Sequence, residues 1–144
     1  MSQKIIERAT EIITKNTVNG EEYMGQYCVL ALIDLEGYPT ASVITPLKAN
    51  GIKQIWLCTG LASDKVKRLE KCDRASICFS SADYNISLVG QIEIKTDIDT
   101  KKEMWFPGLE HHFSGIDDPN YCVLCFTTSR YNFFVDGEEV QGYL

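Results

Sequence analysis

Turn signals divide most of this chain into short β-prone runs, and their spacing constrains the fold more than any other feature. Glu36-Gly37, Asn50-Gly51 and Asp136-Gly137 are typical of tight turns between neighbouring strands. The runs between the turns predict six strands, at residues 27–34, 40–48, 52–58, 74–80, 84–95 and 121–127, and a closing hairpin at residues 131–135 and 139–143. Because hairpins join antiparallel strands, we expect a mainly β protein whose antiparallel sheet closes, fully or in part, into a barrel.

Three helices accompany the predicted strands. Residues 3–15 place isoleucines at helical spacing, residues 63–71 open on the capping residue Ser63, and residues 100–105 follow the capping residue Asp99. Pro46 lies in the predicted strand at residues 40–48 and has no backbone N–H to donate. Its presence indicates an edge strand or a bulge at that position. Because no repeat, low-complexity tract or linker divides the sequence, we expect one domain over residues 1–144.

The composition is that of a globular chain and excludes several classes of partner. Of the 144 residues, 44% are hydrophobic and 24% are charged. A net charge of −6 at pH 7 argues against a nucleic-acid partner, which needs a basic face. No apolar run reaches the length of a membrane span, and the polar N-terminus is unlike a signal peptide. We therefore expect a cytoplasmic protein with no membrane partner.

The six cysteines predict buried thiols rather than a metal site. Most of them lie within apolar runs, as expected of small hydrophobic residues in a reducing compartment. Cys122 and Cys125 have the spacing of half a zinc site, but side chains three positions apart on a strand face opposite ways. No second pair completes the set, so we expect no metal site.

Residues 54–70, QIWLCTGLASDKVKRLE, predict a strand, a short loop and a helix that begins after Ser63. A helix N-terminus offers free backbone N–H groups to an anion, and here Thr59, Ser63 and Lys65 add two hydroxyl groups and a positive charge. The alternative is an ordinary capped helix with a solvated basic face. On this stretch alone, the ordinary helix is the favoured interpretation.

The sequence contains none of the common catalytic templates. The nucleophile elbow, the phosphate-binding loop, the dinucleotide-binding glycine pattern and the zinc-protease motif are all missing. His111 and His112 are the only histidines, and packing in a loop or an interface is favoured for both over a functional role. No residue stands out as a general acid or base, so we assign no catalytic residue.

The order of several short motifs is more informative than any one of them. They are Gly37-x-Pro39, Ile55-Trp56-Leu57-Cys58-Thr59, Ser63-x-Lys65-x-x-x-Leu69, Tyr84-Asn85-Ile86-Ser87-Leu88-Val89-Gly90, Met104-Trp105 and Phe113-Ser114-Gly115-x-Asp117-Asp118-Pro119. Together they resemble the FMN-binding split-barrel family related to pyridoxamine 5′-phosphate oxidase, and in particular its short general-stress-protein branch. The resemblance covers about residues 27–134 and implies a six-stranded antiparallel split β-barrel with Greek-key character.

The resemblance also implies binding roles for ten residues. One strand would lie along the isoalloxazine ring of FMN and offer backbone hydrogen bonds; its residues are Ser42, Val43, Ile44 and Thr45. The ribityl phosphate would be held by Cys58, Thr59, Ser63, Asp64 and Lys65. Asn85 stands where relatives often carry a glutamine near the flavin. Because FMN in this family sits between two subunits, a homodimer is implied.

Three departures from the family pattern narrow the implied function. Ser42 stands in place of a phosphate-binding arginine, so more of the phosphate charge falls on Lys65, and Phe134 stands in place of a tryptophan near the flavin edge. The arginine-rich C-terminal segment that grips vitamin B6 substrates does not follow the closing hairpin. We therefore expect an FMN-dependent reductase or oxidase of another small molecule. The alternatives are a non-enzymatic flavin carrier or sensor linked to stress, and a haem-binding split barrel.

Overall fold

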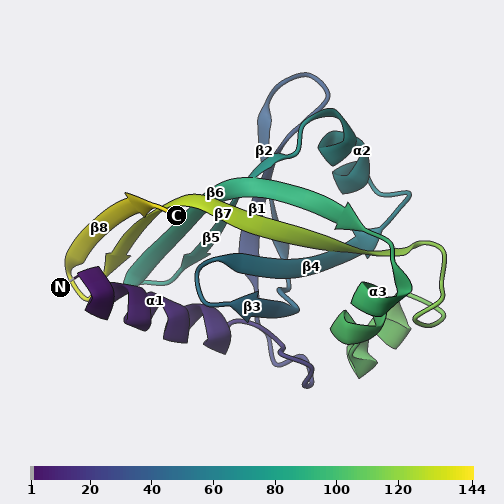
Figure 1. The fold of residues 1–144 in the computed structure, drawn as a ribbon, viewed down its shortest axis with the longest axis horizontal. Helices are drawn as coiled ribbons and strands as arrows, with labels where there is room; N and C mark the ends of the chain where they lie inside the picture. The colour runs from purple at the N-terminus through teal and green to yellow at the C-terminus, as the bar shows by residue number, and fades with distance from the viewer. Residues whose placement is uncertain (1) are drawn as a thin grey trace.

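The computed structural model describes residues 2–144, and strands dominate it (Figure 1). The strands are β1 (Cys28–Ile33), β2 (Pro39–Ile44), β3 (Lys48–Asn50), β4 (Gln54–Gly60), β5 (Arg74–Ser80), β6 (Tyr84–Lys95), β7 (Tyr121–Val135) and β8 (Glu138–Tyr143). The helices are α1 (Ser2–Lys15), α2 (Asp64–Lys71), α3 (Ile98–Met104) and the 3₁₀ helix η1 (Pro107–His111). No helix among residues 2–144 is long and apolar enough to cross a membrane.

All of these strands belong to one antiparallel sheet in the order β2-β1-β5-β6-β7-β4-β3, with β8 paired to β7. The end strands β2 and β3 do not pair with each other, so the sheet stays open on that side. This arrangement confirms the predicted fold class, a mainly β, antiparallel split barrel. Within residues 2–144 the sheet contains eight strands. One predicted strand is divided in two, and two predicted strands are joined into one.

The strand predicted at residues 40–48 is divided by Pro46 into β2 and β3. Pro46 has no N–H to offer a neighbouring strand, and its carbonyl oxygen instead accepts a hydrogen bond from Val18 N at 3.1 Å. The backbone N–H of Asn19 bonds Leu47 O at 2.9 Å in the same way. The break therefore ties the segment after α1 to the segment between β2 and β3.

The strands predicted at residues 121–127 and 131–135 are one continuous strand, β7. Its fifteen residues stay paired with β6 through a register shift between Val89 and Gly90. Such a bulge adds one residue to one strand without ending the pairing. The polar residues between the two predicted strands therefore do not form a turn.

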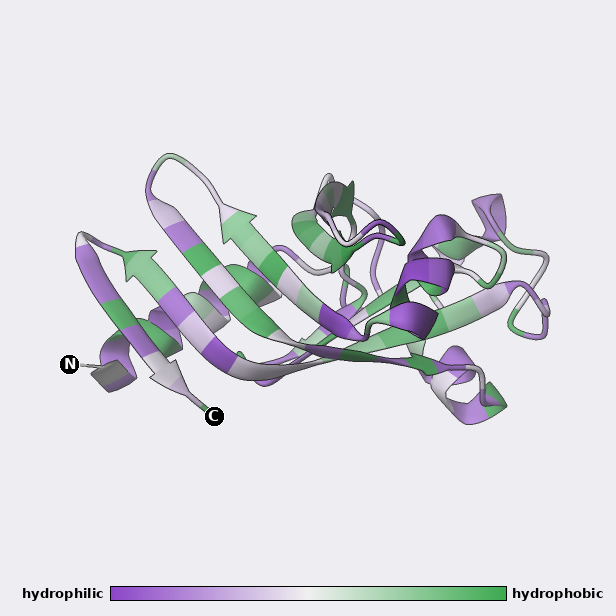
Figure 2. Cartoon of the chain, turned by 90° about the horizontal axis from the view of Figure 1, so that it is seen from above, coloured by the Kyte–Doolittle hydropathy of each residue, from purple (hydrophilic) through white to green (hydrophobic). Residues whose placement is uncertain are grey.

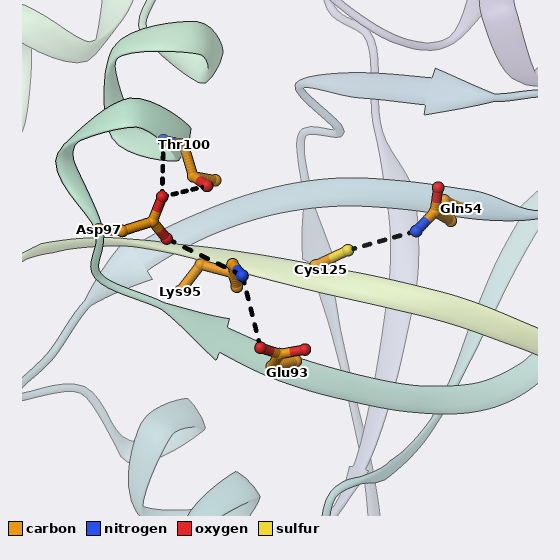
Figure 3. Close-up of polar contacts among 6 residues, drawn as sticks. All are labelled: Gln54, Glu93, Lys95, Asp97, Thr100 and Cys125. Atoms are coloured by element: carbon orange, nitrogen blue, oxygen red, sulfur yellow. Dashed lines mark hydrogen bonds and ion pairs between the residues drawn. The ribbon is translucent and has the colours of Figure 1, made fainter.

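Helix α3 begins earlier than predicted, and its capping residue is Asp97 rather than Asp99. The Asp97 carboxylate accepts hydrogen bonds from Thr100 N at 3.0 Å and from Thr100 Oγ1 at 2.7 Å (Figure 3). Lys95 Nζ lies 3.9 Å from the same carboxylate and 3.5 Å from that of Glu93. These contacts fix the turn through which β6 leads into α3.

Apolar side chains fill two cores on opposite faces of the sheet. The first core lies inside the barrel, where α1 covers it, and Leu124 of β7 belongs to it. The second core lies on the other face of β4 and β7 beneath α3 and η1, and it includes Val123, Phe113 and Tyr121. Val123 and Leu124 are neighbours on one strand and therefore face opposite ways. Figure 2 shows the alternating hydrophobic and hydrophilic bands along the strands.

We predict that Gly90→Ala strongly destabilises the sheet. A methyl group at Gly90 would lie 1.9 Å from the carbonyl oxygen of Thr127 on β7, and this backbone atom is held by strand pairing. We expect the free energy of unfolding, measured by urea denaturation, to fall by at least about 3 kcal/mol. The control is Ser87→Ala, at a half-buried position of the same strand, which should change it by less than about 0.5 kcal/mol. Similar effects of the two substitutions would contradict the close approach at Gly90.

Candidate functional site

A cleft of about 1080 Å³ lies beside the second core. Its walls come from the link that precedes β1, the ends of β2 and β4, η1 with the residues around it, and Asn120. Phe106, Leu109 and Phe113 give it an apolar side that continues into the second core. Because β2 is an edge strand, about half of its backbone N–H and C=O groups face away from its one partner strand. The cleft therefore combines apolar surface with unpaired backbone groups.

Five of the ten residues predicted to bind a cofactor line this cleft. They are Val43, Ile44, Thr45, Cys58 and Thr59. Val43 is 67% exposed, and Thr45 Oγ1 donates to Gln26 O at 3.0 Å. This bond ties the chain at the end of β2 to the link before β1. The structure thus brings the end of β2 and the end of β4 to one cleft.

Ser63, Asp64 and Lys65 lie at the start of α2, next to the cleft rather than in its wall. Thr59 Oγ1 donates to Ser63 Oγ at 3.1 Å, and the same oxygen accepts from Val66 N at 3.4 Å. With both acceptor positions of Ser63 in use, its hydroxyl proton is available to an anion. The N–H groups of Asp64 and Lys65 precede the first intrahelical bonds and have no partner within residues 2–144.

The Lys65 side chain is half-buried and makes no ion pair or hydrogen bond within residues 2–144. Lys67, two positions along the helix, is exposed and pairs with the Asp64 carboxylate at 4.0 Å. Lys65 therefore combines an ammonium group that has no partner within residues 2–144 with a free backbone N–H group in the first turn of the helix. Both features favour an anion at this helix end.

Ser42 and Asn85 do not line the cleft. Ser42 is opposite Leu30 of β1, on the half-buried inner side of β2. Asn85 is exposed on β6, where its Oδ1 accepts from the Cys78 thiol at 3.1 Å and where it is opposite Phe134 of β7. Within one chain, the Ser42 and Asn85 side chains are therefore not part of the cleft wall.

Sequence reasoning missed Asn120 and the segment after α3. Residues 106–113 supply a whole wall of the cleft, and it includes His111 and His112, for which packing in a loop or an interface was expected. The only sequence signal for Asn120 is its place directly after the Asp117-Asp118-Pro119 motif. Its partners lie about sixty positions earlier in the chain, and no local pattern connects them.

Burial keeps the thiol of the cleft protonated. It raises the pKa of Cys58 from 9.0 to about 12, and the neighbouring Cys122 adds to this effect. Because the thiolate is the reactive form of cysteine, Cys58 is not a nucleophile near neutral pH. Its position between the cleft and the second core makes it an apolar contact instead.

The cysteine pair with zinc-like spacing has other partners. The Cys122 thiol bonds Thr59 O at 3.3 Å in the first core, and Cys125 Sγ is 3.9 Å from Gln54 Nε2 (Figure 3). The register of β7 against β4 places these sulfur atoms on opposite faces of the sheet. Within residues 2–144, no three histidine, cysteine or acidic side chains are grouped to hold a metal ion.

We predict that the Cys58 thiol makes stability fall at alkaline pH. An unfolded thiol ionises near 9.0, whereas the folded pKa is about 12, so between these values the unfolded state binds fewer protons. The stabilisation is complete below pH 9.0 and is lost as the pH rises toward 12. Over this interval the free energy of unfolding of the parent should fall more steeply than that of Cys58→Ala, by about 1.4 kcal/mol per pH unit. Equal slopes in urea denaturation would contradict the shift.

Comparison with known proteins places this fold in a family. The pyridoxamine 5′-phosphate oxidase family matches residues 24–134 of the chain. Among solved structures, a protein from Clostridium acetobutylicum related to general stress protein 26 of B. subtilis is 26% identical. It superimposes with a TM-score of 0.83 over 100% of this chain and 97% of that one. No sequence among the curated proteins matches.

Two more distant structures share the fold. An FMN-binding protein from Nostoc punctiforme, related to pyridoxamine 5′-phosphate oxidase, is 14% identical, with a TM-score of 0.63 over 98% of this chain and 95% of that one. A haem-binding protein from Mycobacterium smegmatis is 20% identical, with a TM-score of 0.69 over 94% of this chain and 57% of that one. The family match spans most of the sequence. This chain therefore belongs to the pyridoxamine 5′-phosphate oxidase family.

Proposed function

We propose that this protein binds FMN in its cleft and acts as an oxidoreductase on a small molecule. The observation that carries the proposal is the meeting of two binding surfaces, the unpaired backbone edge of β2 and the N-terminus of α2. They are joined through Thr59, which lines the cleft and bonds Ser63 at 3.1 Å. Flavin mononucleotide uses both kinds of surface, a hydrogen-bonding edge for its ring and an anion site for its phosphate.

The residues present fit this cofactor. The backbone of Val43, Ile44 and Thr45 would bond the ring, while the Ser63 hydroxyl and the α2 N-terminus with Lys65 would hold the phosphate. When bound, FMN supplies the electron-transfer chemistry that the side chains lack, and the chain binds, orients and shields it. Because no dinucleotide-binding fingerprint is present, FMN rather than FAD is the expected flavin. Six free cysteines are consistent with a cytoplasmic location, which is part of this proposal.

A flavin carrier or sensor without enzymatic activity is the main alternative. It draws support from the similarity to a protein related to general stress protein 26. The test is anaerobic addition of a reduced nicotinamide to the FMN-loaded protein, followed by an electron acceptor. Loss of the flavin absorbance and its return with the acceptor supports the oxidoreductase. Flavin that stays oxidised after addition of the reduced nicotinamide favours the carrier or sensor.

Haem is the second candidate ligand, and one observation favours it. His111 and His112 lie on the cleft wall, and a histidine is a common axial ligand of haem iron. The haem-binding protein from Mycobacterium smegmatis shares the fold. The visible spectrum of the purified, ligand-loaded protein separates the two ligands. Broad flavin bands in the blue support FMN, and an intense Soret band supports haem.

We predict that Lys65→Ala weakens FMN binding by about tenfold to a hundredfold. Lys65 would supply the nearest full positive charge to the phosphate, and a charge-assisted hydrogen bond contributes about 1.5–3 kcal/mol. Riboflavin, which has no phosphate, should bind the variant and the parent almost equally. Quenching of flavin fluorescence during titration measures both affinities.

Lys67→Ala is the matched control for this experiment. Lys67 is on the same helix, but it is exposed and already pairs with Asp64. The Lys67→Ala variant should therefore bind FMN with the same affinity as the parent. If both lysine variants bind FMN like the parent, or if Lys65→Ala weakens riboflavin as much as FMN, the phosphate does not lie at this helix.

We further propose a homodimer that buries the outer face of β1 and β2. The register of the two strands places six small or apolar side chains on this face: Val29, Ala31, Ile33, Pro39, Ala41 and Val43. The three residues on β2 are exposed in the single chain, and Val43 also borders the cleft. A partner on this face would cover the apolar surface and close the open side of the cleft. Asn85 would then contribute to the flavin site only from the second subunit.

We predict that the parent protein is a dimer at micromolar concentration and that Ala41→Glu makes it monomeric. Light scattering should give about twice the chain mass of 16.3 kDa for the parent. Ala41 is exposed at the centre of the outer face, so a glutamate there places two charges in a symmetric interface. Ala82→Glu, in the exposed turn between β5 and β6, is the control and should stay dimeric. A parent mass near 16.3 kDa would contradict the dimer.

A further inference from the structure

Asn120 connects the start of β7 to the loop that leads into α2. Its backbone oxygen accepts from Leu61 N at 2.7 Å, and its side-chain Oδ1 accepts from Ala62 N at 3.1 Å. Residues 61 and 62 join β4 to the capping residue Ser63. Asn120 therefore holds the loop that positions the α2 N-terminus, although it lies about sixty positions later in the sequence.

These bonds determine which way the carboxamide of Asn120 points. The Ala62 N–H requires an acceptor, so the amide oxygen faces Ala62 and the NH₂ group takes the other position of the carboxamide. Within residues 2–144, Asn120 Nδ2 has no hydrogen-bond acceptor. Asn120 also lines the cleft beside Thr59 and Gly60. Two N–H donors of fixed direction are therefore available at the end of the cleft nearest α2.

Gly60 makes room for this amide. A methyl group at Gly60 would lie only 2.7 Å from Asn120 Nδ2, closer than ordinary contacts allow. Gly60 has no positive φ, so the space above it, rather than its backbone conformation, is what a larger residue would disturb. The Asn120 NH₂ group therefore lies against the Gly60 backbone.

Hydrogen bonds of Asp118 and Lys101 fix the loop that contains Asn120. The Asp118 carboxylate accepts from Asn120 N and from Ser114 N, each at 2.9 Å, and these bonds lower the pKa of Asp118. The Asp118 backbone oxygen accepts from Lys101 Nζ at 3.0 Å. Lys101 is only 6% exposed, and its own carbonyl accepts from Tyr121 Oη at 2.8 Å. A lysine is rarely buried this deeply, and here it fixes the loop that presents Asn120.

We propose that Asn120 is a ligand-binding residue whose Nδ2–H donates to a phosphate oxygen of the bound mononucleotide. The inference rests on the proposed FMN site and adds a neutral donor on the cleft wall beside Gly60. The carboxamide is neutral, so it adds a hydrogen-bond donor without adding a second positive charge to the site. Its direction is set before any ligand binds, so little conformational entropy is lost on binding.

The substitution Asn120→Asp removes the Nδ2 donor but keeps the hydrogen bond to Ala62 N, so it tests the donor alone. The carboxylate keeps an oxygen for the Ala62 N–H but replaces the NH₂ group with a second, negatively charged oxygen. FMN should bind this variant at least about tenfold more weakly than the parent, while the affinity for riboflavin stays within about twofold. The melting temperature should match that of the parent. Asn120→Ala removes both contacts, so it should also lower the melting temperature.

Gln141→Glu on β8 is the control for added charge. It introduces the same charge at an exposed position outside the cleft, and β8 lies at the end of the sheet opposite η1 (Figure 1). This variant should bind FMN like the parent. The proposal is overturned if Asn120→Asp binds FMN like the parent, or if it loses riboflavin as strongly as FMN. A parent that binds FMN no better than riboflavin overturns the phosphate site itself, and the Asn120 role with it.

Discussion

The pairing of β7 with β6 is the constraint on which both cores and the cleft depend. Before the bulge, even-numbered residues of β7, such as Leu124 and Phe126, face the inside of the barrel. After it, the odd-numbered residues Phe133 and Val135 do so. The shift in pairing at Gly90 absorbs one residue and allows this change. Without that shift, one half of a fifteen-residue strand would present its polar residues to the core.

The same strand places the cleft. Val123 and Tyr121 at the beginning of β7 face away from the barrel and hold η1 and the preceding helix through the second core. The segment around η1 then becomes a wall opposite the end of β2. Because β2 is at the edge of the open sheet, its backbone groups remain unpaired at the point where that wall stands. A closed barrel would have used these groups for strand pairing.

Local patterns predicted much of this architecture because their causes are local. Ser63 caps α2 through a contact only three residues away, and the Asp136-Gly137 turn has the positive φ angles, 53° and 78°, that its residue types favour. The capping residue of α3 was misplaced by two positions because Asp97 and Asp99 are equally suitable by type, and packing decides between them. The continuity of β7 depends on the facing strand, so its own sequence could not reveal it.

The candidate site also contains parts that local sequence patterns predict and parts that depend on long-range contacts. The end of β4 and the start of α2 carry recognisable motifs, and the structure joins them through the bond between Thr59 and Ser63. The role of Asn120 in the cleft depends on contacts across about sixty positions, which a local motif does not reveal. The roles that the resemblance implies for Ser42 and Asn85 stay predictions. Ser42 lies on the half-buried side of β2 and Asn85 lies on β6, and neither lines the cleft of the single chain.

The position of the aromatic residues also has a spectroscopic consequence. Both tryptophans of the chain, Trp56 and Trp105, pack against the second core, and Trp105 meets the Tyr121 ring edge-on at 5.4 Å. The first core contains neither of them. Intrinsic tryptophan fluorescence therefore reports on the face of the sheet that supports the cleft, whereas far-ultraviolet circular dichroism reports on the barrel as a whole. A local opening around η1 would change the emission while the strand signal stayed constant.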